Sequence, residues 1–190
     1  MIYENKDQLK KGCEATLSCE GGDVRILDEE RFRGRLIDDL IQTVAFSPDQ
    51  GTREAAGFLI RRGAAALGIV SSSIQALYDA MGRGEVGGFT VPAINIRGIS
   101  YDVAQAVFRA AMAGNVGPVL FEIARSEIDY TRQRPLEYTC AVTAAAVKTG
   151  WRGPIFLQGD HFQVNAKKFA ADSEKETQAV KNLIWEAIEG

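Results

Sequence analysis

An acidic residue and the single histidine of the chain stand side by side at Asp160 and His161, where two residues separate them from the apolar residues Ile155, Phe156 and Leu157. A neutral imidazole is a common metal ligand, and a carboxylate can act as a base where a metal ion stabilises the carbanion that it creates. Two adjacent residues are a weak motif, since Asp160 can instead cap a loop or helix while His161 is a partly buried bystander. The pair therefore predicts either a metal-assisted proton transfer or an ordinary loop.

Polar residues also interrupt two other apolar stretches, at Asn95 and Glu122. A buried polar side chain needs a hydrogen-bond partner, so Asn95 predicts either a structural hydrogen bond or a site residue. Glu122 is expected as an ionised site residue or as half of an ion pair with Arg97 or Arg125, and we favour the ion pair.

The elements that must position these residues are three apolar stretches, predicted as strands at about 89–96, 117–124 and 153–161. Each is followed by a helical pattern, and the repeated strand starts GPVLFE and GPIFLQ are typical of the strand–helix units of a parallel sheet or barrel. In such folds ligands bind at the carboxyl ends of the strands, which is where Asp160 and His161 fall.

The fold class is therefore α/β. Three units cannot close a barrel of eight, so the chain is either a small open sheet or the first part of a longer protein. We favour the truncated barrel, because a complete three-stranded domain would leave a parallel sheet with an unprotected edge. Residues 1–88 are predicted as a mainly helical segment with a possible short hairpin at Gly21-Gly22, and residues 89–190 as the partial barrel.

The composition and charge of the chain argue against several classes of protein. A chain of 190 residues with a formal net charge of -3 lacks the basic surface of a general nucleic-acid binder. No apolar run approaches the roughly 20 residues that span a bilayer, and the polar start MIYENKDQLKKGCEATL is unlike a secretory signal. The three cysteines form no CxxC pair, and their odd number argues against a disulfide scaffold. We expect a cytoplasmic protein with neither nucleic acid nor membrane as a partner.

The segments GGFTVPAINI, GPVLFEIA and GPIFLQGDH, in this order, resemble the first three strands of the class II, zinc-dependent aldolase family. The resemblance covers about residues 80–190. The family's first strand reads roughly V-P-A-F-N, matched here by residues 91–95, and its third strand ends in H-x-D-H, matched by residues 158–161. Family members are (β/α)8 barrels that cleave or condense phosphorylated ketoses, so the resemblance implies the first three βα units of a TIM (β/α)8-type barrel.

The resemblance also implies roles for individual residues. Asp160 would move a proton to or from the carbon next to the carbonyl, His161 would be a zinc ligand, and Asn95 would line the substrate pocket. A catalytic zinc site needs three protein ligands, so we expect the remaining ligands outside this chain. Further substrate-binding candidates are Glu122, Ser126, Gln163 and Asn165.

The chain departs from the family pattern at three positions. Gln158 replaces the first His of the motif, Glu122 stands where Gln is usual, and Ala124 stands where a phosphate-contacting Ser is common. The stretch GDHFQVNAKKFAADSEKE is more similar to the accessory-subunit branch of tagatose-bisphosphate aldolase.

The favoured function is thus a metal-dependent carbon–carbon lyase for a ketose or ketose phosphate, which as a fragment would be inactive alone. The alternatives are a non-catalytic accessory subunit of a sugar-bisphosphate aldolase and a metal-dependent sugar epimerase. The expected partners are a sugar or sugar phosphate and further copies of the chain in a homo-oligomer.

Overall fold

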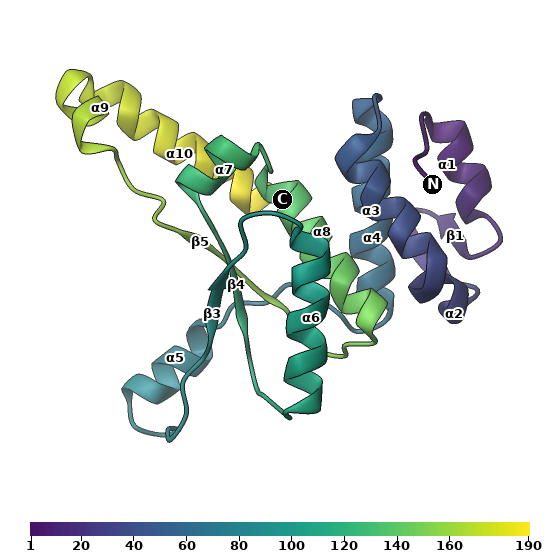
Figure 1. Cartoon of the computed structure of the whole chain (residues 1–190), viewed down its shortest axis with the longest axis horizontal. Coiled ribbons are helices and arrows are strands. Elements are labelled where there is room, and N and C mark those ends of the chain that lie inside the picture. Colours follow the sequence, from purple (N-terminus) through teal and green to yellow (C-terminus); the bar gives the residue numbers. More distant parts are fainter.

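The computed structural model describes all 190 residues as a mixed α/β protein (Figure 1). The N-terminal elements are α1 (Lys6–Cys13), β1 (Leu17–Glu20), β2 (Asp23–Ile26), α2 (Glu29–Arg31), a π-helical turn (Phe32–Leu36), α3 (Ile37–Phe46), α4 (Gln50–Ala66) and α5 (Gln75–Gly82). The remaining elements are β3 (Ala93–Asn95), α6 (Ser100–Ala113), β4 (Leu120–Ala124), α7 (Arg125–Thr131), α8 (Pro135–Thr149), β5 (Phe156–Asp160), α9 (Ala166–Ala171) and α10 (Ser173–Glu189).

The hairpin expected near the N-terminus is present as the antiparallel pair of β1 and β2. Glu20 pairs with Asp23, so the connection contains only Gly21 and Gly22, both of which have positive φ angles of 59° and 89°. A two-residue turn of this kind needs left-handed backbone at both positions, which glycine adopts without steric cost.

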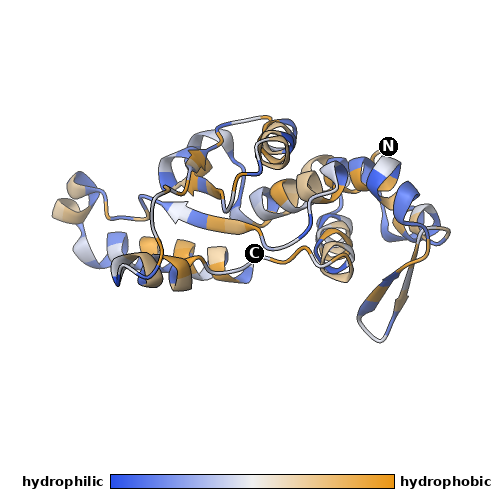
Figure 2. Cartoon of the chain, turned by 90° about the horizontal axis from the view of Figure 1, so that it is seen from below, coloured by the Kyte–Doolittle hydropathy of each residue, from blue (hydrophilic) through white to orange (hydrophobic).

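Strands β3, β4 and β5 form one parallel sheet in that order. The register aligns Asn95 with Glu122 and Glu122 with Gln158, and it aligns Ala124 with Asp160. Strands β3 and β5 begin with apolar residues and end in Asn95 and Asp160, as the change from hydrophobic to hydrophilic along β5 shows in Figure 2, whereas β4 carries Glu122 at its middle and ends in apolar residues. The sheet is open, and no closed barrel is present.

All three strands are shorter than the predicted stretches. Pro92 and Pro118 flank the starts of β3 and β4, and proline cannot donate to a strand ladder. Ile155, just before β5, pairs instead with the N-terminal segment: its N–H donates to the Val70 carbonyl oxygen at 2.9 Å, and Ser72 N–H donates to its carbonyl oxygen at 3.0 Å. Residues 70–72 therefore cover the outer edge of the sheet where β5 begins.

One hydrophobic core joins the residues on both sides of position 88. Phe32 and Ile60 from the N-terminal helices are fully buried, as are Val142 and Val147 from α8. Helix α8 packs against α3, α4 and α6, and it is the element that links the N-terminal helices to the sheet (Figure 1).

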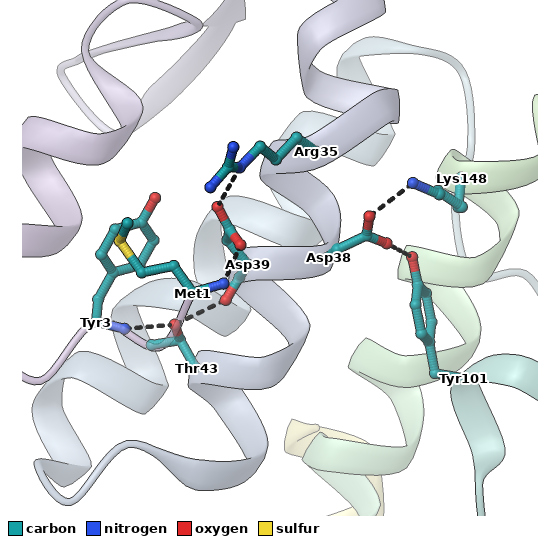
Figure 3. Close-up of polar contacts among 8 residues, drawn as sticks. All are labelled: Met1, Tyr3, Arg35, Asp38, Asp39, Thr43, Tyr101 and Lys148. Atoms are coloured by element: carbon teal, nitrogen blue, oxygen red, sulfur yellow. Dashed lines mark hydrogen bonds and ion pairs between the residues drawn. The ribbon is translucent and has the colours of Figure 1, made fainter.

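Two neighbouring aspartates on α3 make polar contacts in opposite directions (Figure 3). Asp38 accepts hydrogen bonds from the Tyr101 hydroxyl of α6 at 2.7 Å and from the Lys148 ammonium of α8 at 2.6 Å. Asp39 pairs with the amino group of Met1 and with Arg35. Helix α3 is thus tied both to the N-terminus and to the βα units.

None of the helices combines the length and the apolar character that crossing a membrane requires.

Candidate functional site

The polar residues at the carboxyl edge of the sheet share one face. Asn95, Glu122 and Gln158 are register neighbours on adjacent strands, and Asp160 follows Gln158 by two residues. Side chains on a strand alternate between faces, so these four lie on the same side of the sheet. Phe121, on the other face, contacts the ring of Phe108 in α6, with ring centroids 5.0 Å apart. The helix-covered face is therefore apolar, and the opposite face carries the polar residues.

Asp160 is the last residue of β5, and its carboxylate is held by two donors. Asn95 Nδ2 donates to Oδ2 at 3.1 Å, and His161 Nδ1 lies 2.6 Å from Oδ1. The hydrogen bond from His161, together with that from Asn95, outweighs the effect of burial and holds the pKa of Asp160 below its ordinary value. Asp160 is therefore an ionised carboxylate in neutral solution, fixed in orientation by its two partners.

His161 occupies a backbone conformation that suits few residues. Its φ angle is 48°, in the left-handed region, and 68% of its side chain is exposed. The hydrogen bond and the charge of Asp160 raise the pKa of His161. Because Nδ1 faces Asp160, Nε2 is the ring nitrogen available to a ligand, an arrangement found where a carboxylate orients a metal-binding histidine.

Glu122 is buried on β4, the central strand. Its Oε1 accepts a hydrogen bond from Gln158 Nε2 at 2.8 Å. Burial first, and the charge of Asp160 second, raise the pKa of Glu122. The predicted ion pair with Arg97 or Arg125 is wrong, because both arginines pair with other glutamates.

Glu127 is the residue of this cluster that the sequence pattern did not reveal. It is 3% exposed and lies at the third position of α7, immediately after β4. Its Oε2 accepts from the Ala124 N–H at 2.8 Å and from Asn95 Nδ2 at 3.2 Å, and its Oε1 accepts from Arg97 Nε at 2.6 Å. A glutamate at the third position of a helix often accepts a hydrogen bond from the backbone N–H of the N-cap residue, which here is Ala124. The three-residue spacing between Ala124 and Glu127 was therefore the sequence feature from which this contact could have been predicted.

The pKa of Glu127 reflects this set of donors. Burial raises the pKa, but the hydrogen bonds from Ala124, Arg97 and Asn95 outweigh burial, so that the pKa lies below its ordinary value. Glu127 is therefore a buried carboxylate that stays ionised, and it fixes the carboxamide of Asn95.

The other predicted substrate contacts lie outside this cluster. Ser126 is exposed on α7, and Gln163 is exposed and contacts Arg125 only through its carbonyl oxygen, at 2.8 Å. Asn165 caps α9, since its side-chain oxygen accepts from the N–H groups of Lys167 and Lys168 at 3.1 Å. None of the three hydrogen-bonds with Asn95, Glu122 or Asp160.

The residues present do not by themselves make a zinc centre. No group of three or more His, Cys, Asp and Glu side chains is arranged to hold a metal ion. Catalytic zinc takes three protein ligands and keeps one open position, whereas this edge offers a single imidazole beside carboxylates that are already hydrogen-bonded. Zinc at His161 stays a prediction that requires ligands from outside these 190 residues.

Comparison of the chain with models of protein families, with curated proteins and with solved structures finds no match.

Proposed function

We propose that the carboxyl edge of the β3–β4–β5 sheet is the proton-transfer site of a class II aldolase-like lyase, which acts on a ketose or ketose phosphate. The observation that carries this proposal is the position of Asp160, held between Asn95 at 3.1 Å and His161 at 2.6 Å where three parallel strands end. Within the same proposal, the open sheet is the first part of a (β/α)8 barrel, in which ligands bind at this end of the strands.

Two carboxyl groups with opposite pKa shifts support proton transfer here. The pKa of Asp160 is lowered and that of Glu122 is raised, although the two residues lie on adjacent strands. Environments that shift the pKa values of two neighbouring titratable groups in opposite directions are typical of an acid and a base that act in the same reaction. Asp160 would take the proton from the carbon next to the substrate carbonyl, and Glu122 would help to hold a second proton near the same edge.

The proposal is tested by hydrogen exchange into a small ketose phosphate. A longer chain that continues the proposed barrel past Gly190 and supplies the remaining zinc ligands is incubated with dihydroxyacetone phosphate in D₂O with 1 mM ZnCl₂, and the carbon-bound protons next to the carbonyl are followed by ¹H NMR. We expect slow exchange above the buffer rate, which disappears in Asp160→Asn. Exchange no faster than in buffer, or equal exchange in the variant, would overturn the proposal.

A matched control separates a catalytic effect from a general one. Asp172 is the N-cap of α10, and its carboxylate accepts from the Lys175 N–H at 2.9 Å. Asparagine caps helices about as well as aspartate, so Asp172→Asn removes one carboxylate without loss of the cap. We expect Asp172→Asn to exchange the ketose protons at the wild-type rate.

The second candidate function is a non-catalytic accessory subunit. The observation that favours it is the contact of Gln158, which stands where the family motif has its first His and donates its amide to Glu122 at 2.8 Å. An accessory subunit predicts no exchange in the NMR assay, and it predicts increased activity of a separate aldolase when the chain is added.

A further inference from the structure

A cavity of about 370 Å³ lies between the first residues of the chain, α1, and the helical segment that runs from α2 into α3. Lys11 and Gly12 of α1 contribute to its lining, as do Arg31 of α2 and Asp39 of α3. No residue of the Asp160 cluster lines this cavity. It is therefore a separate space, and what it binds does not depend on the proton-transfer site.

The charged side chains of this cavity are mostly positive. Lys11, Arg31 and Arg35 line it together with one carboxylate, that of Asp39. Asp39 pairs with the amino group of Met1 and with Arg35, whose Nε lies 3.6 Å from Oδ2 (Figure 3). Lys11 and Arg31 take part in no ion pair. Three cationic side chains against one carboxylate leave two positive charges uncompensated, even before the Met1 amino group is added.

Neutral side chains add hydrogen-bond donors to the same space. Tyr3 is 4% exposed and lines the cavity, and its hydroxyl donates to no group of the protein. Burial raises the pKa of Tyr3 to about 12, so the hydroxyl keeps its proton in neutral solution. Gly12 leaves room for it, because a Cβ atom added there would overlap the Tyr3 hydroxyl oxygen. Gln8 accepts the Glu4 N–H through Oε1 at 3.0 Å, which leaves its Nε2 group free to donate.

This set of groups suits a small phosphate monoester. Guanidinium groups match the oxygens of a phosphate in pairs, and a lysine adds a point charge. A phosphate monoester carries nearly two negative charges at neutral pH, since its second pKa is about 6, and it offers three acceptor oxygens. The cavity is near the lower limit of ligand pockets, which hold roughly 300 to 1,000 Å³, so its volume suits a small metabolite.

We propose that this cavity binds a small phosphate monoester, with Lys11, Arg31 and Arg35 around the phosphate oxygens and with the Tyr3 hydroxyl as a further donor. Asp39 limits the affinity, because its carboxylate competes with the ligand for Arg35. Binding would add contacts between α1 and the segment from α2 to α3.

The probe for this proposal is glycerol 3-phosphate, added to the 190-residue chain with an untagged N-terminus. In ¹H–¹⁵N spectra, we expect saturable shifts at the backbone amides of Lys11, Gly12 and Arg31. Glycerol lacks the phosphate and should not bind measurably. Malonate carries two charges on separate carboxylates, so we expect it to bind at least about tenfold more weakly. Binding should weaken below about pH 6, where the monoester takes up a proton, and with added NaCl.

Three variants remove proposed contacts. Lys11→Gln and Arg31→Gln, both at exposed positions, are expected to lower the affinity about threefold to tenfold each. Tyr3→Phe keeps the ring and removes the hydroxyl, and we expect a loss of about threefold. The matched controls are Lys10→Gln on α1 and Arg25→Gln on β2, which are exposed, lie outside the cavity lining and should bind the probe as the wild type does.

A fourth variant should bind more tightly. Asp39→Asn removes the carboxylate of the cavity and releases Arg35, so we expect its affinity to rise about threefold to tenfold. Asp38→Asn changes the net charge of the chain by the same amount, but its side chain contacts Tyr101 and Lys148 instead. We expect Asp38→Asn to bind the probe with the wild-type affinity.

The outcomes separate this proposal from the one for Asp160. Shifts confined to α1 and the segment from α2 to α3, with weaker binding in Lys11→Gln and Arg31→Gln, would support the phosphate site. The absence of saturable binding, equal affinity for malonate, equal loss in the control variants, or shifts centred on Asp160 would overturn it. Circular dichroism of each variant shows whether it is folded, and the two exposed positions keep the test available if Asp39→Asn does not fold.

Discussion

The carboxamide of Asn95 donates to two carboxylates at once, reaching Asp160 at 3.1 Å and Glu127 at 3.2 Å. Asn95 and Asp160 are 65 positions apart in the chain, and the parallel sheet brings them to one edge. Glu127 makes no hydrogen bond with Asp160, yet it fixes the Asn95 amide that holds Asp160 in place. The orientation of the proposed base thus depends on a buried carboxylate in the next helix.

Glu127→Gln tests this dependence. The variant keeps the size of the side chain but loses the charge that attracts Arg97 and two further donors. Because a buried charged acceptor is lost, we expect the free energy of unfolding to fall by about 1 to 3 kcal/mol, measured by urea denaturation. Glu174→Gln, at an exposed position on α10, serves as the control and should change it by less than about 0.5 kcal/mol. Equal stabilities of the two variants would contradict the role of Glu127.

The titration of His161 tests its pairing with Asp160. The chain has one histidine, so its imidazole C2 proton gives one unambiguous NMR signal. The hydrogen bond and charge of Asp160 raise the pKa of His161, so we expect a midpoint above the ordinary value of about 6.5. In Asp160→Asn the midpoint should fall toward that value. A midpoint that is unchanged by the substitution would show that the two side chains do not interact.

The pairing of Asp160 with His161 also makes the free energy of unfolding depend on pH, in two separate pH ranges. Because the pKa of His161 is raised by folding, its contribution is complete below about pH 6.5 and is lost as the pH rises through the folded pKa. Because the pKa of Asp160 is lowered by folding, its contribution is present above about pH 3.9 and is lost as the pH falls through the folded pKa. The contribution of the pair is therefore largest between these limits, and Asp160→Asn should remove it.

Glu122→Gln should stabilise the protein at neutral pH. Burial and the charge of Asp160 raise the pKa of Glu122, so the folded state binds a proton that the unfolded state has released. Stability attributable to this residue therefore decreases as the pH rises from the unfolded pKa, about 4.3, through the folded one. The stability gained by Glu122→Gln should accordingly grow between pH 4 and pH 7 in urea titrations. A gain that is independent of pH would contradict the raised pKa.

The close packing of the N-terminal helices is tested by two glycines. A Cβ atom added at Gly63 of α4 would lie 2.5 Å from the fully buried Phe32 ring, whereas one at Gly34 would meet no atom within 4 Å. We expect Gly63→Ala to destabilise the protein by about 1 to 3 kcal/mol, because the core must move. Gly34→Ala lies in a helical turn with open space and should be stabilising by up to about 1 kcal/mol. In thermal unfolding, we therefore expect the midpoint temperature to fall in Gly63→Ala and to rise in Gly34→Ala.

The parallel arrangement of three strands and the hairpin at Gly21-Gly22 could be predicted, because both depend on local patterns of apolar residues and turn glycines. The contacts of the candidate site depend instead on which long side chains meet after folding. Glu122 contacts Gln158 rather than an arginine, and Asn165 is a helix cap. Neither contact could be predicted from the spacing of residues in the sequence, because each side chain has several possible partners of suitable chemistry.

The contact of Tyr101 with Asp38 tests whether the N-terminal helices and the βα units unfold together. The Tyr101 hydroxyl donates to Asp38 at 2.7 Å, and burial, followed by this hydrogen bond, raises the pKa of Tyr101 (Figure 3). In Tyr101→Phe, Asp38 keeps Lys148 as a partner, so we expect a loss of only about 0.5 to 1.5 kcal/mol in the free energy of unfolding. Tyr130→Phe, at a residue 61% exposed, is the control and should have no measurable effect.

Since one core spans both parts of the chain, the loss in Tyr101→Phe should appear as a shift of a single cooperative transition, seen identically by circular dichroism and by tryptophan fluorescence. The two tryptophans, Trp151 and Trp185, lie in the C-terminal part, whereas circular dichroism reports helices from both parts. If the fluorescence transition moved while part of the dichroism signal stayed in place, the N-terminal helices would be a unit that folds without the Asp38 contact.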